Sequence, residues 1–102
     1  MLCDFVDSLR ITARARGELD QIRTRLEREA SARIALYVED AIFDAFEDLV
    51  RLPAVGHKRP GIGRPDYLFH NVFSYVIIFR REPRVVILRV VHGKRDLPSS
   101  VH

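Results

Sequence analysis

The chain has 102 residues, which suffice for one hydrophobic core but not for two separate domains. Hydrophobic residues make up 47% of it and charged residues 30%, a composition that excludes an intrinsically disordered chain. The 17 Lys and Arg residues against 14 Asp and Glu give a net charge of +3, which suits an acidic or polyanionic partner without requiring one.

Cysteine use and the N-terminal residues indicate the compartment. The single cysteine, Cys3, cannot form an internal disulfide, so we expect a reducing compartment, the cytoplasm. Asp4 and Asp7 interrupt the apolar residues of a possible signal peptide, and no segment approaches the roughly 20 apolar residues of a membrane span. We therefore predict one cytoplasmic domain over residues 1–102, with a weakly defined arm at 1–7 and a polar tail at 98–102.

The first regular elements are a short strand and a helix. Residues 9–12 read as an edge strand, because a charge alternates with apolar side chains, and Thr12 is a candidate N-cap. A helix is predicted from 13 to about 28. Its apolar residues recur at spacings of four, three and four and form one stripe: Ala15, Leu19, Ile22 and Leu26.

A second helix is predicted from 32 to about 52, capped by Ser31, and the short link makes the two helices an antiparallel hairpin. This helix is apolar along two lines, which either belong entirely to the core or leave one stripe for a partner protein. The first line is Ile34, Val38, Ala41, Ala45 and Leu49, and the second is Leu36, Phe43, Phe46 and Val50.

The C-terminal half predicts strands. After Pro53, a basic loop rich in Gly and Pro spans residues 56–66, and it does not match a phosphate-binding loop because a strand, not a helix, follows it. Strands are predicted at 67–72, 75–79 and 85–91, and the last two form a hairpin around Pro83.

Both strands of that hairpin are apolar on both faces, so we place them in the middle of a sheet. In the first strand Tyr75, Ile77 and Phe79 oppose Val76 and Ile78; in the second, Val86, Leu88 and Val90 oppose Val85, Ile87 and Val91. The predicted order is strand, helix, helix, strand, strand, strand. This is a two-layer α+β fold with the helical hairpin on one face of a small, mostly antiparallel sheet.

The candidate functional residues are basic. The four histidines have no metal-ligand spacing, no cofactor motif is present, and no Ser or Cys nucleophile stands in a recognisable elbow. The hairpin turn carries Arg80, Arg81 and Arg84, and for the last two we favour a role in solubility. His92, Lys94 and Arg95 follow the last strand and are equally open to a functional role. Alternatively, Arg95 pairs with Asp96, and Arg89, a charge among apolar neighbours, pairs with an acid of a helix.

Five stretches stand in an order and spacing that a known family shares: Ile11-Thr12-Ala13-Arg14-Ala15, Glu18-Leu19-Asp20-Gln21-Ile22, Pro53-Ala54-Val55-Gly56, Tyr75-Val76-Ile77-Ile78-Phe79-Arg80 and Ile87-Leu88-Arg89-Val90-Val91-His92-Gly93-Lys94-Arg95-Asp96. With them, residues 9–97 resemble the ParE branch of the RelE/ParE toxin superfamily. The resemblance implies the same fold and a toxin that forms a hetero-oligomer with its cognate antitoxin. The C-terminal segment of such an antitoxin folds on binding and wraps the toxin, here over Leu36, Phe43, Phe46 and Val50.

Two activities divide the superfamily. RelE-like members cleave ribosome-bound mRNA with strand lysines and arginines and often a C-terminal Tyr. Here Asp66, Leu68 and Tyr75 stand at the strand positions, and the tail ends without Tyr. The resemblance therefore favours the ParE-like activity, poisoning of DNA gyrase by binding without enzymatic chemistry, with mRNA cleavage as the alternative. Target-binding candidates are His92, Lys94, Arg95 and Arg80. The low net charge and the absence of a recognition helix argue against a module that contacts DNA directly, so DNA contact is expected only through the antitoxin or gyrase.

Overall fold

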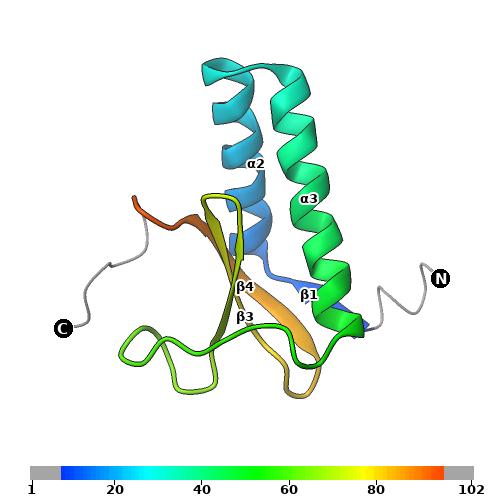
Figure 1. Ribbon diagram of the computed structural model, residues 1–102, viewed down its shortest axis with the longest axis vertical. Helices are drawn as coiled ribbons and strands as arrows, with labels where there is room; N and C mark the ends of the chain where they lie inside the picture. Colours follow the sequence, from blue (N-terminus) through cyan, green and yellow to red (C-terminus); the bar gives the residue numbers. More distant parts are fainter. Residues whose placement is uncertain (1–7, 96–102) are drawn as a thin grey trace.

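The computed structural model describes residues 8–95, so the predictions for the arm at 1–7, for Asp96 and for the tail at 98–102 lie outside the described residues. The elements follow in the order β1 (Leu9–Ile11), α2 (Ala13–Glu29), α3 (Ala32–Arg51), β2 (Leu68–Val72), β3 (Tyr75–Arg80) and β4 (Val85–His92). The predicted α+β fold and its element order are confirmed. Figure 1 shows the two helices side by side, with the sheet across their lower part.

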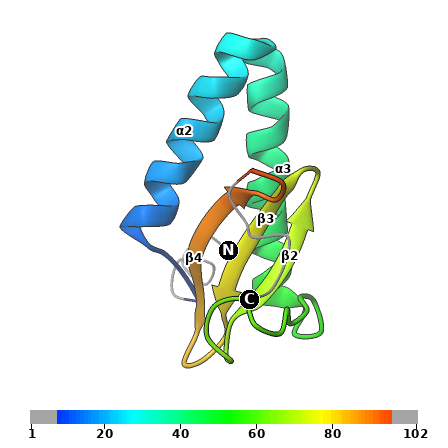
Figure 2. The ribbon, with the colours of Figure 1, turned by 90° about the vertical axis from the view of Figure 1, so that its left-hand side faces the viewer.

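Each helix begins where a side-chain oxygen satisfies a free backbone N–H group. The Thr12 hydroxyl accepts from the backbone N–H of Ala15 at 3.1 Å, and the Ser31 hydroxyl accepts from the N–H of Ile34 at 3.0 Å. Both predicted N-caps are therefore confirmed. The turn between the helices projects beyond the sheet, as Figures 1 and 2 show from two sides.

The sheet has four strands in the order β1-β4-β3-β2. β1 is an edge strand and runs parallel to β4, whereas β4, β3 and β2 pair antiparallel. Where β1 ends, the chain stays attached to β4, because the backbone N–H of Thr12 donates to the carbonyl of Ile87 at 3.1 Å. The start of α2 is thereby fixed against the middle of β4.

Both faces of the central strands are buried, as the sequence predicts. Alternate residues of β3 separate into two clusters. Tyr75, Ile77 and Phe79 join the main core under the helices. Val76 and Ile78 join a smaller cluster with Phe69 on the other face, against residues of the loop between α3 and β2. The loop covers the face that the helices leave open.

The strict alternation predicted for β4 is wrong because of a β-bulge. Ile78 pairs with Arg89 but the next residue, Phe79, pairs with Ile87, so Leu88 is an extra residue in β4. The inward side therefore changes along the strand: Val85, Ile87 and Val90 lie in the main core. Strict alternation would place Arg89 on the same face of the sheet as Ile87. The extra residue changes this register, and Arg89 pairs with Ile78.

The two apolar lines of α3 also require correction. Phe46 has no exposed surface and belongs to the core, so it is not part of a free stripe, and Val50 packs against the core as a partly buried residue. Conversely, Ile34 is 43% exposed. The core-facing residues instead include Ile42, which neither predicted line contains and which is completely buried.

Arg81 holds the C-terminus of α3 to the sheet, which corrects its assignment to solubility. Its guanidinium donates to the carbonyls of Leu49 at 2.7 Å, Leu52 at 3.1 Å and Val55 at 2.6 Å. The same group lies 5.3 Å from the ring centroid of Phe79. A helix ends with unpaired carbonyls and a partial negative charge, and a guanidinium satisfies both.

Candidate functional site

Three of the four predicted target-binding residues lie together at the end of β4. Nδ1 of His92 accepts from the backbone N–H groups of Lys94 at 3.2 Å and Arg95 at 3.3 Å. In the neutral ring the proton is therefore on Nε2. The His92 ring meets the edge of Tyr75, with centroids 5.5 Å apart and planes at 82°. His92 thus shapes the turn from which the exposed side chains of Lys94 and Arg95 project.

Arg80 is not part of this group. Tyr75 pairs with His92, whereas Arg80 is five residues further along β3 and pairs with Val86. At about 3.3 Å per residue, the two ends of β3 are about 17 Å apart. Arg80 instead lines a small hollow with Lys58 and Glu82, and its Nε is buried without a hydrogen-bond partner among the described residues.

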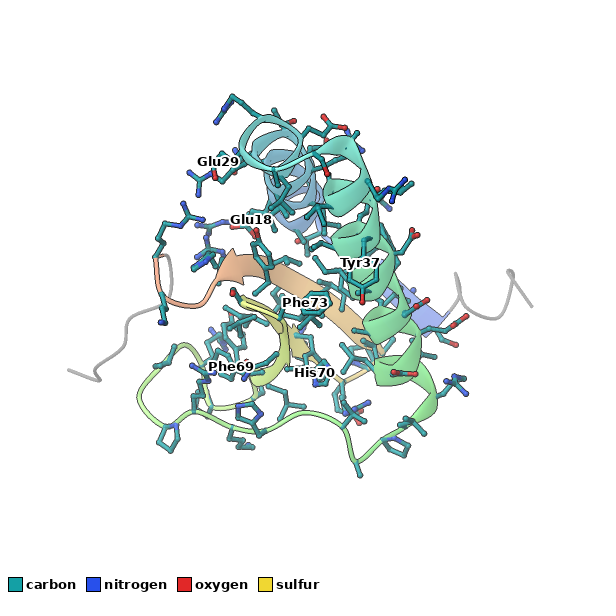
Figure 3. The ribbon with its side chains drawn as sticks, turned by 45° about the horizontal axis from the view of Figure 1, so that its top comes forward. Glu18, Glu29, Tyr37, Phe69, His70 and Phe73 are labelled. Carbon is teal, nitrogen blue, oxygen red and sulfur yellow. The ribbon has the colours of Figure 1, made fainter. Side chains whose placement is uncertain are left out.

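A cleft of about 520 Å³ separates α2 from the end of β4. Figure 3 shows Glu18 at this place, beside the end of β4, with nitrogen-tipped side chains on the same side. Helix α2 and the strand end both contribute residues, and we call this hollow the α2–β4 cleft; it is lined by Glu18, Gln21, Ile22, Arg25, Tyr75, Arg89, Val90, His92 and Arg95.

Glu18 binds two groups of β4 at once. One carboxylate oxygen accepts from Nε of Arg89 at 3.0 Å and from Nη2 at 2.6 Å. The other accepts from the backbone N–H of Val90 at 2.9 Å. The alternative in which Arg89 pairs with an acid of a helix is thereby confirmed. β1 pairs with β4 only as far as Ile87, so this carboxylate satisfies a strand edge that β1 leaves open.

Sequence reasoning missed the contribution of α2 to the cleft. Gln21 and Arg25 belong to the polar face of a predicted helix, which the sequence alone assigns to solvent. The one available signal was Arg89, whose charge within an apolar strand requires an acidic partner from another element.

Exposed apolar side chains on α3 form the second candidate surface. Of the predicted antitoxin-binding residues, Leu36 is 58% exposed and Phe43 is 39% exposed, whereas Phe46 is buried. Sequence reasoning missed a further pair, Tyr37 and Phe73, whose ring centroids are 5.7 Å apart. Figure 3 shows these two side chains pointing toward each other from α3 and from the turn between β2 and β3. Phe73 has a φ of 55°, a left-handed conformation that is uncommon for an aromatic residue.

The basic loop lies away from the α2–β4 cleft and its residues bind their own surroundings. Nζ of Lys58 donates to the carbonyl of Pro65 at 2.9 Å, and the Arg59 guanidinium lies 5.6 Å from the ring centroid of Phe69. Burial lowers the pKa of His70. The charge of Asp48 raises this pKa by a smaller amount, and the charge of His57 lowers it further. Residues 8–95 contain no group of three or more His, Cys, Asp or Glu placed to hold a metal ion.

Three residues stand at the positions where the resemblance to RelE-like enzymes would place lysines and an arginine, and each of them packs or pairs with its neighbours in this structure. Leu68 packs against the main core, and Tyr75 is only 7% exposed, beneath His92. Asp66 lies 3.8 Å from Arg64 in an exposed ion pair.

Neither helix of the described chain is long and apolar enough to cross a membrane.

Comparison with solved structures finds similar folds. The chain matches a structure described as the chromosomal ParDE toxin–antitoxin system from P. aeruginosa, with a TM-score of 0.71 and 21% identity over 83% of this chain and 94% of that one. It also matches the RelBE2 toxin–antitoxin complex from Mycobacterium tuberculosis, with a TM-score of 0.51 and 27% identity over 83% of this chain and 95% of that one. A comparison with curated proteins gives no match.

Comparison with protein families is more specific. The family described as the ParE toxin of the type II toxin-antitoxin system parDE matches residues 9–97, which include the elements from β1 to β4 and the residues that line the α2–β4 cleft. The chain therefore belongs to the ParE family of type II toxin–antitoxin toxins.

Proposed function

We propose that this ParE-family toxin binds DNA gyrase and stalls it with cleaved DNA, and that a cognate antitoxin neutralises it. Family membership supports this proposal most directly. The candidate contact surface is the end of β4, where Lys94 and Arg95 are exposed on a turn that His92 holds in place. Such a turn can bind a target without chemistry of its own.

Supercoiling and DNA-cleavage assays with purified toxin and gyrase test the proposal. We expect loss of supercoiling and accumulation of cleaved DNA, both reversed by the antitoxin. Replacing Lys94 and Arg95 together with Met should raise the inhibitory concentration at least about tenfold, because interface charges contribute to binding and to encounter. Arg84→Met is the matched control, since Arg84 is an exposed arginine in the turn between β3 and β4. Unaffected gyrase at high toxin excess would disprove the target.

The antitoxin is proposed to cover the exposed apolar residues of α3. Leu36 and Phe43 present apolar surface to solvent, while the exposed acids Asp40 and Glu47 lie about one turn from them on the same helix. Both solved structures above come from toxin–antitoxin systems, which supports a partner of this kind. A segment that folds on binding could bury this apolar surface and leave the polar rim exposed.

A second candidate function is cleavage of ribosome-bound mRNA. It is favoured by one observation: His92, whose imidazole is a common acid–base group, shares the α2–β4 cleft with Arg25, Arg89 and Arg95. One observation counts against it: the Arg89 guanidinium is already hydrogen-bonded to the Glu18 carboxylate and is not free to bind a phosphate. Mapping of mRNA ends in translation extracts distinguishes the two. Cuts that disappear with His92→Gln, together with unaffected gyrase, would replace the first proposal with this one.

A further inference from the structure

The α2–β4 cleft contains more positive charge than its own acid neutralises. Three arginines line it, Arg25 from α2, Arg89 from β4 and Arg95 from the following turn, against the single carboxylate of Glu18. Gln21 adds an amide that can donate hydrogen bonds. Since like charges in one hollow repel each other, the cleft favours an anion.

Arg89 is already satisfied. Its Nε and Nη2 both donate to Glu18, whose second oxygen accepts from the Val90 backbone. The Glu18 carboxylate therefore already serves as the anion for Arg89. An external anion would contact the guanidinium groups of Arg25 and Arg95.

Arg25 and Arg95 are available for such a ligand. The only carboxylate within ion-pair distance of Arg25 in the described residues is Glu29, at 3.8 Å on the helix surface, with both side chains substantially exposed. Exposed pairs of this type contribute little to stability, so a ligand can displace Glu29. For Arg95, no carboxylate of residues 8–95 lies within that distance, and its exposed side chain already lines the cleft.

We propose that the α2–β4 cleft binds a phosphate group between Arg25 and Arg95. The two guanidinium groups come from different elements that line the cleft, so a ligand that joins them must present oxygens in more than one direction. A tetrahedral phosphate does so, whereas a planar carboxylate presents both oxygens along one edge. At about 520 Å³ the cleft has room for a nucleotide or for part of a nucleic-acid backbone.

Proton–nitrogen NMR of the arginine side chains tests this assignment with labelled full-length toxin in phosphate-free buffer. The probes are inorganic phosphate, a thymidine 5′-monophosphate, a short single-stranded oligothymidylate and, as the carboxylate comparison, acetate. We expect the Nε–H signals of Arg25 and Arg95 to shift with at least one phosphate probe. Arg25→Met and Arg95→Met should each weaken binding about tenfold, because each removes charge-assisted hydrogen bonds. Arg16→Met is the matched control, since it removes an exposed arginine of the same helix that does not line the cleft.

The arms separate the sources of the phosphate. Tighter binding of the oligonucleotide than of the mononucleotide identifies a nucleic-acid backbone, and the reverse order identifies a free phosphorylated ligand; both support the proposal. Three results would overturn it: no phosphate probe binds at millimolar concentration, acetate binds as well as phosphate, or Arg16→Met weakens binding as much as Arg25→Met. The assignment does not depend on gyrase, since a toxin that inhibits gyrase and binds no phosphate refutes this inference alone.

Discussion

Replacing Arg81 tests how the helical hairpin is held to the sheet. Arg81→Met keeps most of the side-chain length and apolar stem but removes three hydrogen bonds to carbonyls of Leu49, Leu52 and Val55. A hydrogen bond to a charged group contributes about 1.5–3 kcal/mol, so a simple sum would be about 4.5–9 kcal/mol. When the guanidinium is lost, the Leu52 carbonyl can recover water because Leu52 is 45% exposed, whereas Leu49 is fully buried. We therefore expect a loss of about 2–4 kcal/mol in the free energy of unfolding.

That loss is large for a domain of this size, whose total stability is about 5–15 kcal/mol. It corresponds to a fall in Tm of about 10–20 °C. Urea unfolding followed by far-UV circular dichroism measures it as a midpoint shift of about 1–2 M. Arg81→Lys should lose less, since an ammonium keeps the charge at the helix end but cannot reach all three carbonyls as the planar fork does.

The control is Arg84→Met, which removes an exposed arginine of the same turn and should change stability by less than about 0.5 kcal/mol. If Arg81→Met unfolds at the same urea concentration as Arg84→Met, the three hydrogen bonds do not hold α3 to the sheet.

Three further predictions concern Glu18, the α3 residues and His70. Glu18→Ala should lower stability by about 2–3 kcal/mol in urea unfolding, because it leaves Arg89 and a strand-edge N–H without their acceptor, and Glu18→Gln should lose less. Phe46→Ala should cost about 3–5 kcal/mol because the residue is fully buried, whereas Leu36→Ala should leave stability nearly unchanged and weaken antitoxin binding in calorimetry. The pKa of His70 is lowered from 6.5 by burial, so the unfolded chain binds the proton more readily. Stability should be fully present above pH 6.5 and fall as the pH drops below it, and His70→Gln should remove that part of the pH dependence.

Each of these has a contradicting result. Equal stability of Glu18→Ala and the parent chain would mean that water replaces the carboxylate at the strand edge. A Leu36 variant that unfolds as easily as the Phe46 variant would contradict the separation of surface from core on α3. An unchanged pH profile in the His70 variant would assign the acid sensitivity to another group.

Elements with a clear period were predictable from the sequence, and features that depend on distant contacts were not. The helix caps at Thr12 and Ser31 and the doubly apolar hairpin strands follow from local residue types, and the structure confirms them. The bulge at Leu88 depends on how β3 and β4 pair, which a run of apolar residues does not encode. The contact of Arg81 with Leu49 joins residues 32 positions apart, and nothing near Arg81 in the sequence indicates it.

The candidate site was predictable in part for the same reason. The residues that follow β4 were found because they are adjacent in sequence, but Arg80, grouped with them by charge, lies at the other end of β3. Arg25 was missed because its position depends on how far α2 tilts over β4. That placement is set by Glu18, which is 71 residues from its partner Arg89.

The closure of the sheet edge and the construction of the α2–β4 cleft depend on the same hydrogen bonds. β1 ends at Ile11, so the edge of β4 beyond Ile87 would be open if α2 did not cover it. The Thr12 hydroxyl donates to the carbonyl of Leu88 at 3.1 Å, and Glu18, almost two turns later, accepts from Val90. These two side chains fix both the start and the direction of α2 along β4, and this sets where Arg25 stands relative to the end of the strand. A helix displaced by one residue would leave the Val90 N–H without its acceptor and would move Arg25 out of register with the turn after β4. The geometry that protects the strand edge is therefore also the geometry that keeps the arginines around one hollow.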